Sequence, residues 1–171
     1  MLRISKNIKN VLLIGLGIFI IAACQSPKEK ALKSIKNMES NDSAFSNELM
    51  MSLKTSYIDF ALAYPDDEQT PGFLFKAAQR AVVLQQANES VDLLLQLINK
   101  YPANEFAEDA TFLLAFTYEN NLNDLTNARK YYEQFLKNFP KGELAEEARL
   151  SIANLGKTTE EFFNEIETAK E

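Results

Sequence analysis

Side chains that could do chemistry are few in this chain, and most of them are carboxylates. The 171 residues include one cysteine and no histidine, so a histidine base or a Cys/His metal site cannot form. Acidic neighbours occur at 66–68, 108–109, 146–147 and 160–161. Such runs are typical of a solvated surface or of the first turn of a helix, where they interact favourably with the helix dipole. The sequence therefore predicts no catalytic residue, no cofactor and no metal ion.

The thiol of Cys24 stands at the end of a short apolar run. Residues 1–10 carry three basic side chains and no acid, residues 11–22 are apolar throughout, and the small pair Ala22-Ala23 precedes the cysteine. This arrangement resembles the lipobox of a bacterial lipoprotein precursor. The resemblance implies that residues 1–23 are a signal peptide, and that Cys24 becomes the first residue of the mature chain and carries covalent lipid.

Two other interpretations of the apolar run stay open. A transmembrane anchor needs about 20 residues, and the run from Val11 to Ala23 has 13. An ordinary cleaved signal would put the sole cysteine at the cleavage point by chance. Enterobacterial lipoproteins kept in the inner membrane have Asp after the cysteine, so by resemblance Gln25 implies the outer membrane, facing the periplasm.

The net charge limits the kinds of partner. Of the 18 basic residues, 15 follow the predicted signal peptide and face 24 acidic residues, which gives a net charge of −9. Nucleic acid requires a basic face, and electrostatic binding to anionic lipid requires a basic cluster. We therefore expect no nucleic-acid partner, and membrane attachment through acyl chains alone.

The mature chain is predicted to be all-α, because it contains only three glycines and its apolar residues recur with helical spacing. Residues 24–42 are polar and are predicted to form a lipidated tether, with at most a weak helix around Ala31–Met38. Residues 43–171 are predicted to form one helical repeat domain. We expect its helices near 43–63, 72–86, 88–100, 104–121, 124–138, 142–155 and 159–169, the last opened by a capping box of Thr158 and Glu161.

An internal repeat supports this map. Tyr101-Pro102 recurs 38 residues later as Phe139-Pro140. A third copy, Tyr64-Pro65, stands 37 residues before Tyr101-Pro102. A residue before proline is disfavoured in the α region, so each of these steps is predicted to end a helix. The offset continues past the proline, where Glu105, Ala107, Glu108, Ala110 and Ala115 recur as Glu143, Ala145, Glu146, Ala148 and Ala153. A period of this length indicates stacked helical hairpins.

The repeat resembles the tetratricopeptide repeat. Its signature positions hold Leu114, Ala115, Tyr118, Ala128, Tyr132 and Pro140, with one residue inserted before Asp124; the preceding unit, with Ala77, Ala78, Ala81, Ser90, Leu94 and Pro102, matches less well. The resemblance implies a short right-handed solenoid of antiparallel hairpins, with about two complete repeats, a half repeat at each end and a terminal helix. Small residues at Ala78, Ala115 and Ala153 would let paired helices approach closely. An unrelated helical bundle is the alternative.

In this family the first helix of each repeat lines a binding groove. By register, the resemblance implies that the partner-binding residues are Phe75, Gln79, Phe112, Phe116, Glu119, Leu150 and Asn154. Phe112 and Phe116 lie four residues apart and share one helix face, and ordinary core packing is the other interpretation of this pair.

The mature chain also resembles two bacterial families, the lipoprotein of the outer-membrane β-barrel assembly machine and the periplasmic repeat protein of the Tol-Pal system. The Tyr-Pro and Phe-Pro steps, each followed by an acidic-Ala motif, carry this likeness. It implies a lipid-anchored adaptor that binds an envelope protein or peptide. A structural spacer and an accessory subunit of an envelope enzyme are the alternatives.

Lipidation of Cys24 can be tested directly. Mass spectrometry of the mature protein should find Cys24 as the first residue, with acyl mass added. Cys24→Ala should release the domain from membranes or leave an unprocessed precursor, without lowering the melting temperature. An intact Met1–Ala23 segment on the mature protein would contradict the prediction.

Overall fold

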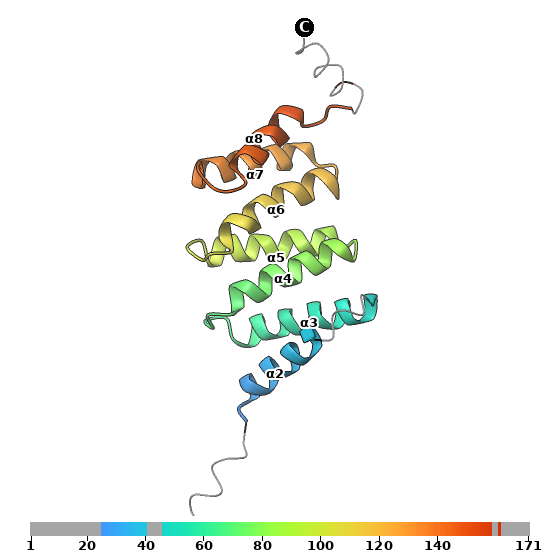
Figure 1. Ribbon diagram of the computed structural model, residues 1–171, viewed down its shortest axis with the longest axis vertical. Coiled ribbons are helices and arrows are strands. Elements are labelled where there is room, and N and C mark those ends of the chain that lie inside the picture. The colour runs from blue at the N-terminus through green and yellow to red at the C-terminus, as the bar shows by residue number, and fades with distance from the viewer. Residues whose placement is uncertain (1–24, 41–45, 159–160, 162–171) are drawn as a thin grey trace, which may run out of the picture.

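The computed structural model describes residues 25–40, 46–158 and 161. This part of the chain forms seven α-helices and no strand. The helices are α2 (Pro27–Ser40), α3 (Asn47–Ala63), α4 (Thr70–Val83), α5 (Ala87–Lys100), α6 (Ala107–Asn120), α7 (Leu125–Asn138) and α8 (Ala145–Asn154). Each helix packs on the next along one axis, so the molecule is an elongated stack (Figure 1). None of the described helices is long and apolar enough to cross a membrane.

The predicted all-α solenoid is confirmed, and α3 to α8 begin and end within a few residues of the expected bounds. The helix expected at 159–169 lies outside the described residues except for Glu161. Its capping box is present, because the Thr158 amide donates to the Glu161 carboxylate at 2.8 Å and the Glu161 amide donates to the Thr158 hydroxyl at 3.2 Å.

The aromatic-proline steps end α3, α5 and α7 as predicted. The residue before each proline has left the helical region, with φ between −133° and −129° and ψ between 52° and 61°. Each turn then repeats one hydrogen bond, in which an amide three residues on donates to the aromatic residue's carbonyl at 3.1 Å: Asp67 to Tyr64, Asn104 to Tyr101 and Gly142 to Phe139. Three equivalent turns place successive hairpins in similar orientations.

The turns within the hairpins also match each other. Gln85 and Asn123, 38 residues apart, both adopt positive φ, 60° and 52°. Leu84–Gln86 link α4 to α5, and the longer segment Asn121–Asp124 links α6 to α7. The residue predicted to be inserted before Asp124 is therefore accommodated in the turn, and the helices keep their register.

Small residues occupy the places where helices approach most closely. Ala78, Ala115 and Ala128 are fully buried, and Tyr57 and Tyr132 are the largest buried side chains beside them. The expectation that Ala153 is buried in the same way is wrong, because the structure leaves it exposed. The helix expected to pack over it, 159–169, lies outside the described residues.

The first helix differs from the expected tether. Residues 27–40 form α2, which packs on α3 and buries Ile35 to 2% exposure. Lys28 pairs with Asp67 in the turn after α3, and Lys76 of α4 pairs with Glu39. The helical domain thus begins at Pro27, and a hairpin of α2 and α3 stands where a half repeat was expected. The apolar residues of α2 recur three positions apart, so one face of the helix is buried although the segment is polar on average.

Overpacking at Ala115 should destabilise the stack. Ala115→Phe puts a large ring into a fully buried crossing and should lower the free energy of unfolding by about 1–3 kcal/mol. Ala153→Phe is the matched control, since this side chain is exposed and its change should stay within about 0.5 kcal/mol. Equal thermal or denaturant melts for the two variants would contradict this packing.

Ser90 offers a test in the opposite direction. Its hydroxyl is fully buried and has no hydrogen-bond partner among the described residues, and the equivalent residue of the next repeat is Ala128. Ser90→Ala removes an unsatisfied polar atom and should raise the free energy of unfolding by about 1 kcal/mol. Thr111→Val is the control, because the Thr111 hydroxyl donates to the Ala107 carbonyl at 2.7 Å, and its loss should lower stability.

Candidate functional site

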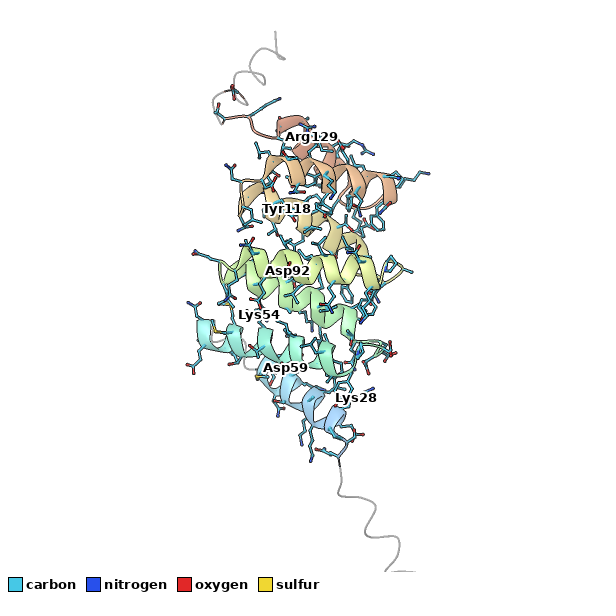
Figure 2. All side chains as sticks on the ribbon, turned by 180° about the vertical axis from the view of Figure 1, so that it is seen from behind. Lys28, Lys54, Asp59, Asp92, Tyr118 and Arg129 are labelled. Atoms are coloured by element: carbon cyan, nitrogen blue, oxygen red, sulfur yellow. The ribbon has the colours of Figure 1, made fainter. Side chains whose placement is uncertain are left out.

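Two hollows open along α2, α4 and the start of α6, and they meet at Lys76. The first, of about 380 Å³, is lined by Glu39, Tyr57, Lys76, Gln79, Arg80 and Val83. The second, of about 500 Å³, lies between the segment from Gly72 to Lys76 on α4 and the segment Asn104–Phe106 before α6. We call the side formed by α2, α4, α6 and α8 the first-helix face. Figure 2 views the stack from behind, where Asp59, Asp92 and Arg129 mark the other helices, α3, α5 and α7.

Gly72 permits the close approach at the second hollow. A Cβ at this position would lie 3.0 Å from the ring of Phe106. The Phe106 ring also stacks on Phe75 with 5.7 Å between ring centroids. The start of α6 is therefore held against α4 by an aromatic contact, and Gly72 leaves room for the Phe106 ring where a side chain would crowd it.

A hydrogen-bonded carboxylate lies at one end of the first hollow. The Tyr57 hydroxyl donates to Glu39 at 2.9 Å, and the Lys76 ammonium donates to the same oxygen at 2.6 Å. Burial alone would raise the pKa of Glu39, but the hydrogen bonds from Lys76 and Tyr57 outweigh it and lower the pKa. Burial and the Glu39 charge raise the pKa of Tyr57, so this phenol stays protonated.

The same pair recurs in the hairpin of α6 and α7. The Tyr132 hydroxyl donates to Glu119 at 2.7 Å. Burial raises the pKa of Tyr132. A hydrogen bond with Ser151 of α8 lowers this pKa, and the hydrogen bond and charge of Glu119 raise it further. Glu39 and Glu119 are both the last residue but one of their helices. In the intervening α4–α5 hairpin, Val82 and Leu94 occupy the positions equivalent to Glu119 and Tyr132.

The predicted groove residues divide into two groups. Phe75 and Phe112 are half-buried and engaged with other rings; Phe112 meets Tyr132 and Phe135 edge-on, at 5.5 and 5.7 Å between centroids. Packing within the hairpin therefore explains most of the burial of the Phe112 ring, as the core-packing interpretation predicted. Phe75 does not line the hollows, where the neighbouring residue Lys76 stands.

The other predicted groove residues are accessible. Phe116 is 41% exposed and Leu150 is 55% exposed, Gln79 is exposed and lines the first hollow, and Glu119 and Asn154 are half-exposed. Four residues that line the first hollow were not predicted from the sequence: Glu39, Tyr57, Lys76 and Arg80. Lys76 and Arg80 stand four apart, one turn along the face that also carries Gln79, and that spacing was a usable signal.

Among the described residues, no group of three or more His, Cys, Asp or Glu side chains is placed so that it could hold a metal ion. The acidic pairs 108–109 and 146–147 lie in the first turns of α6 and α8, as expected of helix starts.

Residues 109–142 match the family model of the tetratricopeptide repeat. This segment is similar to one tetratricopeptide repeat. The match covers most of α6, all of α7 and the turn to Gly142, and within it the signature residues Leu114, Ala115, Ala128 and Tyr132 are fully buried. No curated protein matches the chain. Tetratricopeptide repeats generally bind other proteins, and the fold is typically a non-catalytic scaffold.

Truncation should separate the two phenylalanines of α6. Phe112→Ala removes two edge-on aromatic contacts and should lower the free energy of unfolding by about 2–4 kcal/mol. Phe116→Ala removes an exposed ring, and its change should stay below about 1 kcal/mol. Melting curves of both variants check this, and an equal loss for Phe116→Ala would place its ring in the core.

Proposed function

We propose that the protein is a lipid-anchored adaptor of the bacterial cell envelope, held at the outer membrane through Cys24, and that it binds another protein or peptide on its first-helix face. By the resemblance to the assembly-machine lipoprotein, outer-membrane protein assembly is the process in which it would act. The observation that carries the adaptor role is the first-helix face itself, with two adjoining hollows and an exposed phenylalanine on a tetratricopeptide repeat.

The start of α2 bears on how the anchor would act. Pro27 begins the helix three residues after Cys24, a distance of at most about 11 Å for extended chain. A lipid on Cys24 would therefore hold the first hairpin next to the membrane surface, in contrast to the long reach of a polar tether. The stack would then extend away from the anchored end, with α8 farthest along it (Figure 1).

The accessible side chains of α6 and α8 support partner binding. Aromatic anchors in partly apolar surfaces are where binding energy concentrates in protein interfaces. Phe116 and Leu150 are large apolar residues left exposed, while Glu119 and Asn154 supply polar groups beside them. This combination of a few apolar anchors with hydrogen-bonding neighbours is what a peptide-binding face requires.

Site-specific photo-crosslinking in living cells tests the proposal. A benzoylphenylalanine at position 116 should give one dominant crosslinked envelope protein, and the same probe at Leu62, an exposed residue of α3, should not. Membrane fractions should contain the adduct in the parent and lose it with Cys24→Ala. Crosslinks of equal strength at both positions, or none at 116, would contradict binding on the first-helix face and favour the spacer.

A further inference from the structure

The two Glu–Tyr pairs of the stack differ in one respect. In the α2–α3 hairpin the Glu39 carboxylate accepts from Tyr57 and from the cation of Lys76, which comes from the next first helix, α4. In the α6–α7 hairpin the Glu119 carboxylate accepts from Tyr132. The next first helix there is α8, and the repeat register places Ser151 where α4 has Lys76. Leu155 likewise stands in the place of Arg80.

Within the part of the chain that the structure describes, no cation pairs with the Glu119 carboxylate. No ion pair of the described residues includes it, and the hydrogen bond from Tyr132 engages one of its two oxygens. Lys157, on the turn after α8, directs its ammonium to Asn154 at 3.4 Å. Tyr132 holds the carboxylate in a defined position, because its own ring is fully buried. A carboxylate with free acceptor sites, fixed at a half-exposed place, is a receptor for an incoming donor.

We propose that Glu119 and Tyr132 form a subsite for a lysine or arginine side chain of the partner polypeptide. The ligand cation would take the place that Lys76 fills in the first hairpin. This proposal rests on the adaptor function and names the chemistry of the partner at that same face.

The surroundings suit a long basic side chain. Phe116 lies one turn before Glu119 on α6, and its exposed ring can pack on an aliphatic stem or face a cation. Leu150 on α8 adds apolar surface. The first hollow, in contrast, already contains Lys76 and Arg80. The first-helix face thus offers a cation receptor at its α6–α8 end and supplies its own cations at its α2–α4 end.

A peptide array tests the subsite with the full-length protein purified in detergent. Each spot carries nonapeptides of mixed composition with one fixed central residue. The parent should be retained on central Lys or Arg roughly tenfold more than on central Gln or Met, as expected for one charge-assisted contact. Glu119→Gln should abolish that preference.

A second variant separates binding from folding. Ser151→Lys supplies the cation from within the chain, as Lys76 does for Glu39. It should raise the melting temperature and also abolish the Lys/Arg preference, so that unfolding cannot explain the loss. Ser151→Gln, neutral and similar in length, should keep the preference.

The other outcomes overturn the subsite. No basic preference in the parent, a preference for acidic residues, or a basic preference that survives in both Glu119→Gln and Ser151→Lys would each exclude it. The photo-crosslink at position 116 reports on the adaptor role separately. If a partner crosslinks at position 116 but the protein shows no preference for Lys or Arg peptides, the adaptor function is supported and only the cation subsite is excluded.

Discussion

Close approach of the two helices within each hairpin is the constraint on which the rest of this structure depends. Helix axes come near each other only where the facing side chains are small. The chain meets this condition with Ala78, Ala115 and Ala128, all fully buried, and fills the adjoining space with Tyr57 and Tyr132. Within two of the hairpins the tyrosine hydroxyl reaches a glutamate near the end of the preceding helix, Tyr57 to Glu39 and Tyr132 to Glu119.

The turns convert this local packing into a continuous face. The aromatic-proline steps end the second helices with nearly identical backbone angles, and an equivalent hydrogen bond follows each step. Successive hairpins therefore stack with a constant offset, and α2, α4, α6 and α8 lie along one side (Figure 1). Among the described helices, α4 and α6 are each held between two neighbouring helices, which makes this face rigid.

Three expectations from the sequence differ from the structure for a common reason. Residues 24–42 are polar on average, yet one face of α2 buries Ile35 against α3. Ala153 occupies the same repeat position as Ala115, yet it is exposed. Phe112 and Phe116 share a helix face, yet one contacts Tyr132 and Phe135 and the other faces outward. In each case the outcome depends on which neighbouring element is present, and a residue's own type does not carry that information.

By itself, the sequence determined the helical class, the repeat period, the places where the second helices end and the close-packing alanines Ala78 and Ala115. These follow from local chemistry: proline after an aromatic residue, apolar spacing and small side chains at a fixed offset. Only the tertiary structure decided that Glu39 has a cation while Glu119 has none among the described residues, and that Lys76 lines two hollows. These features arise between helices that are distant in sequence, because the solenoid brings the end of one first helix beside the middle of the next.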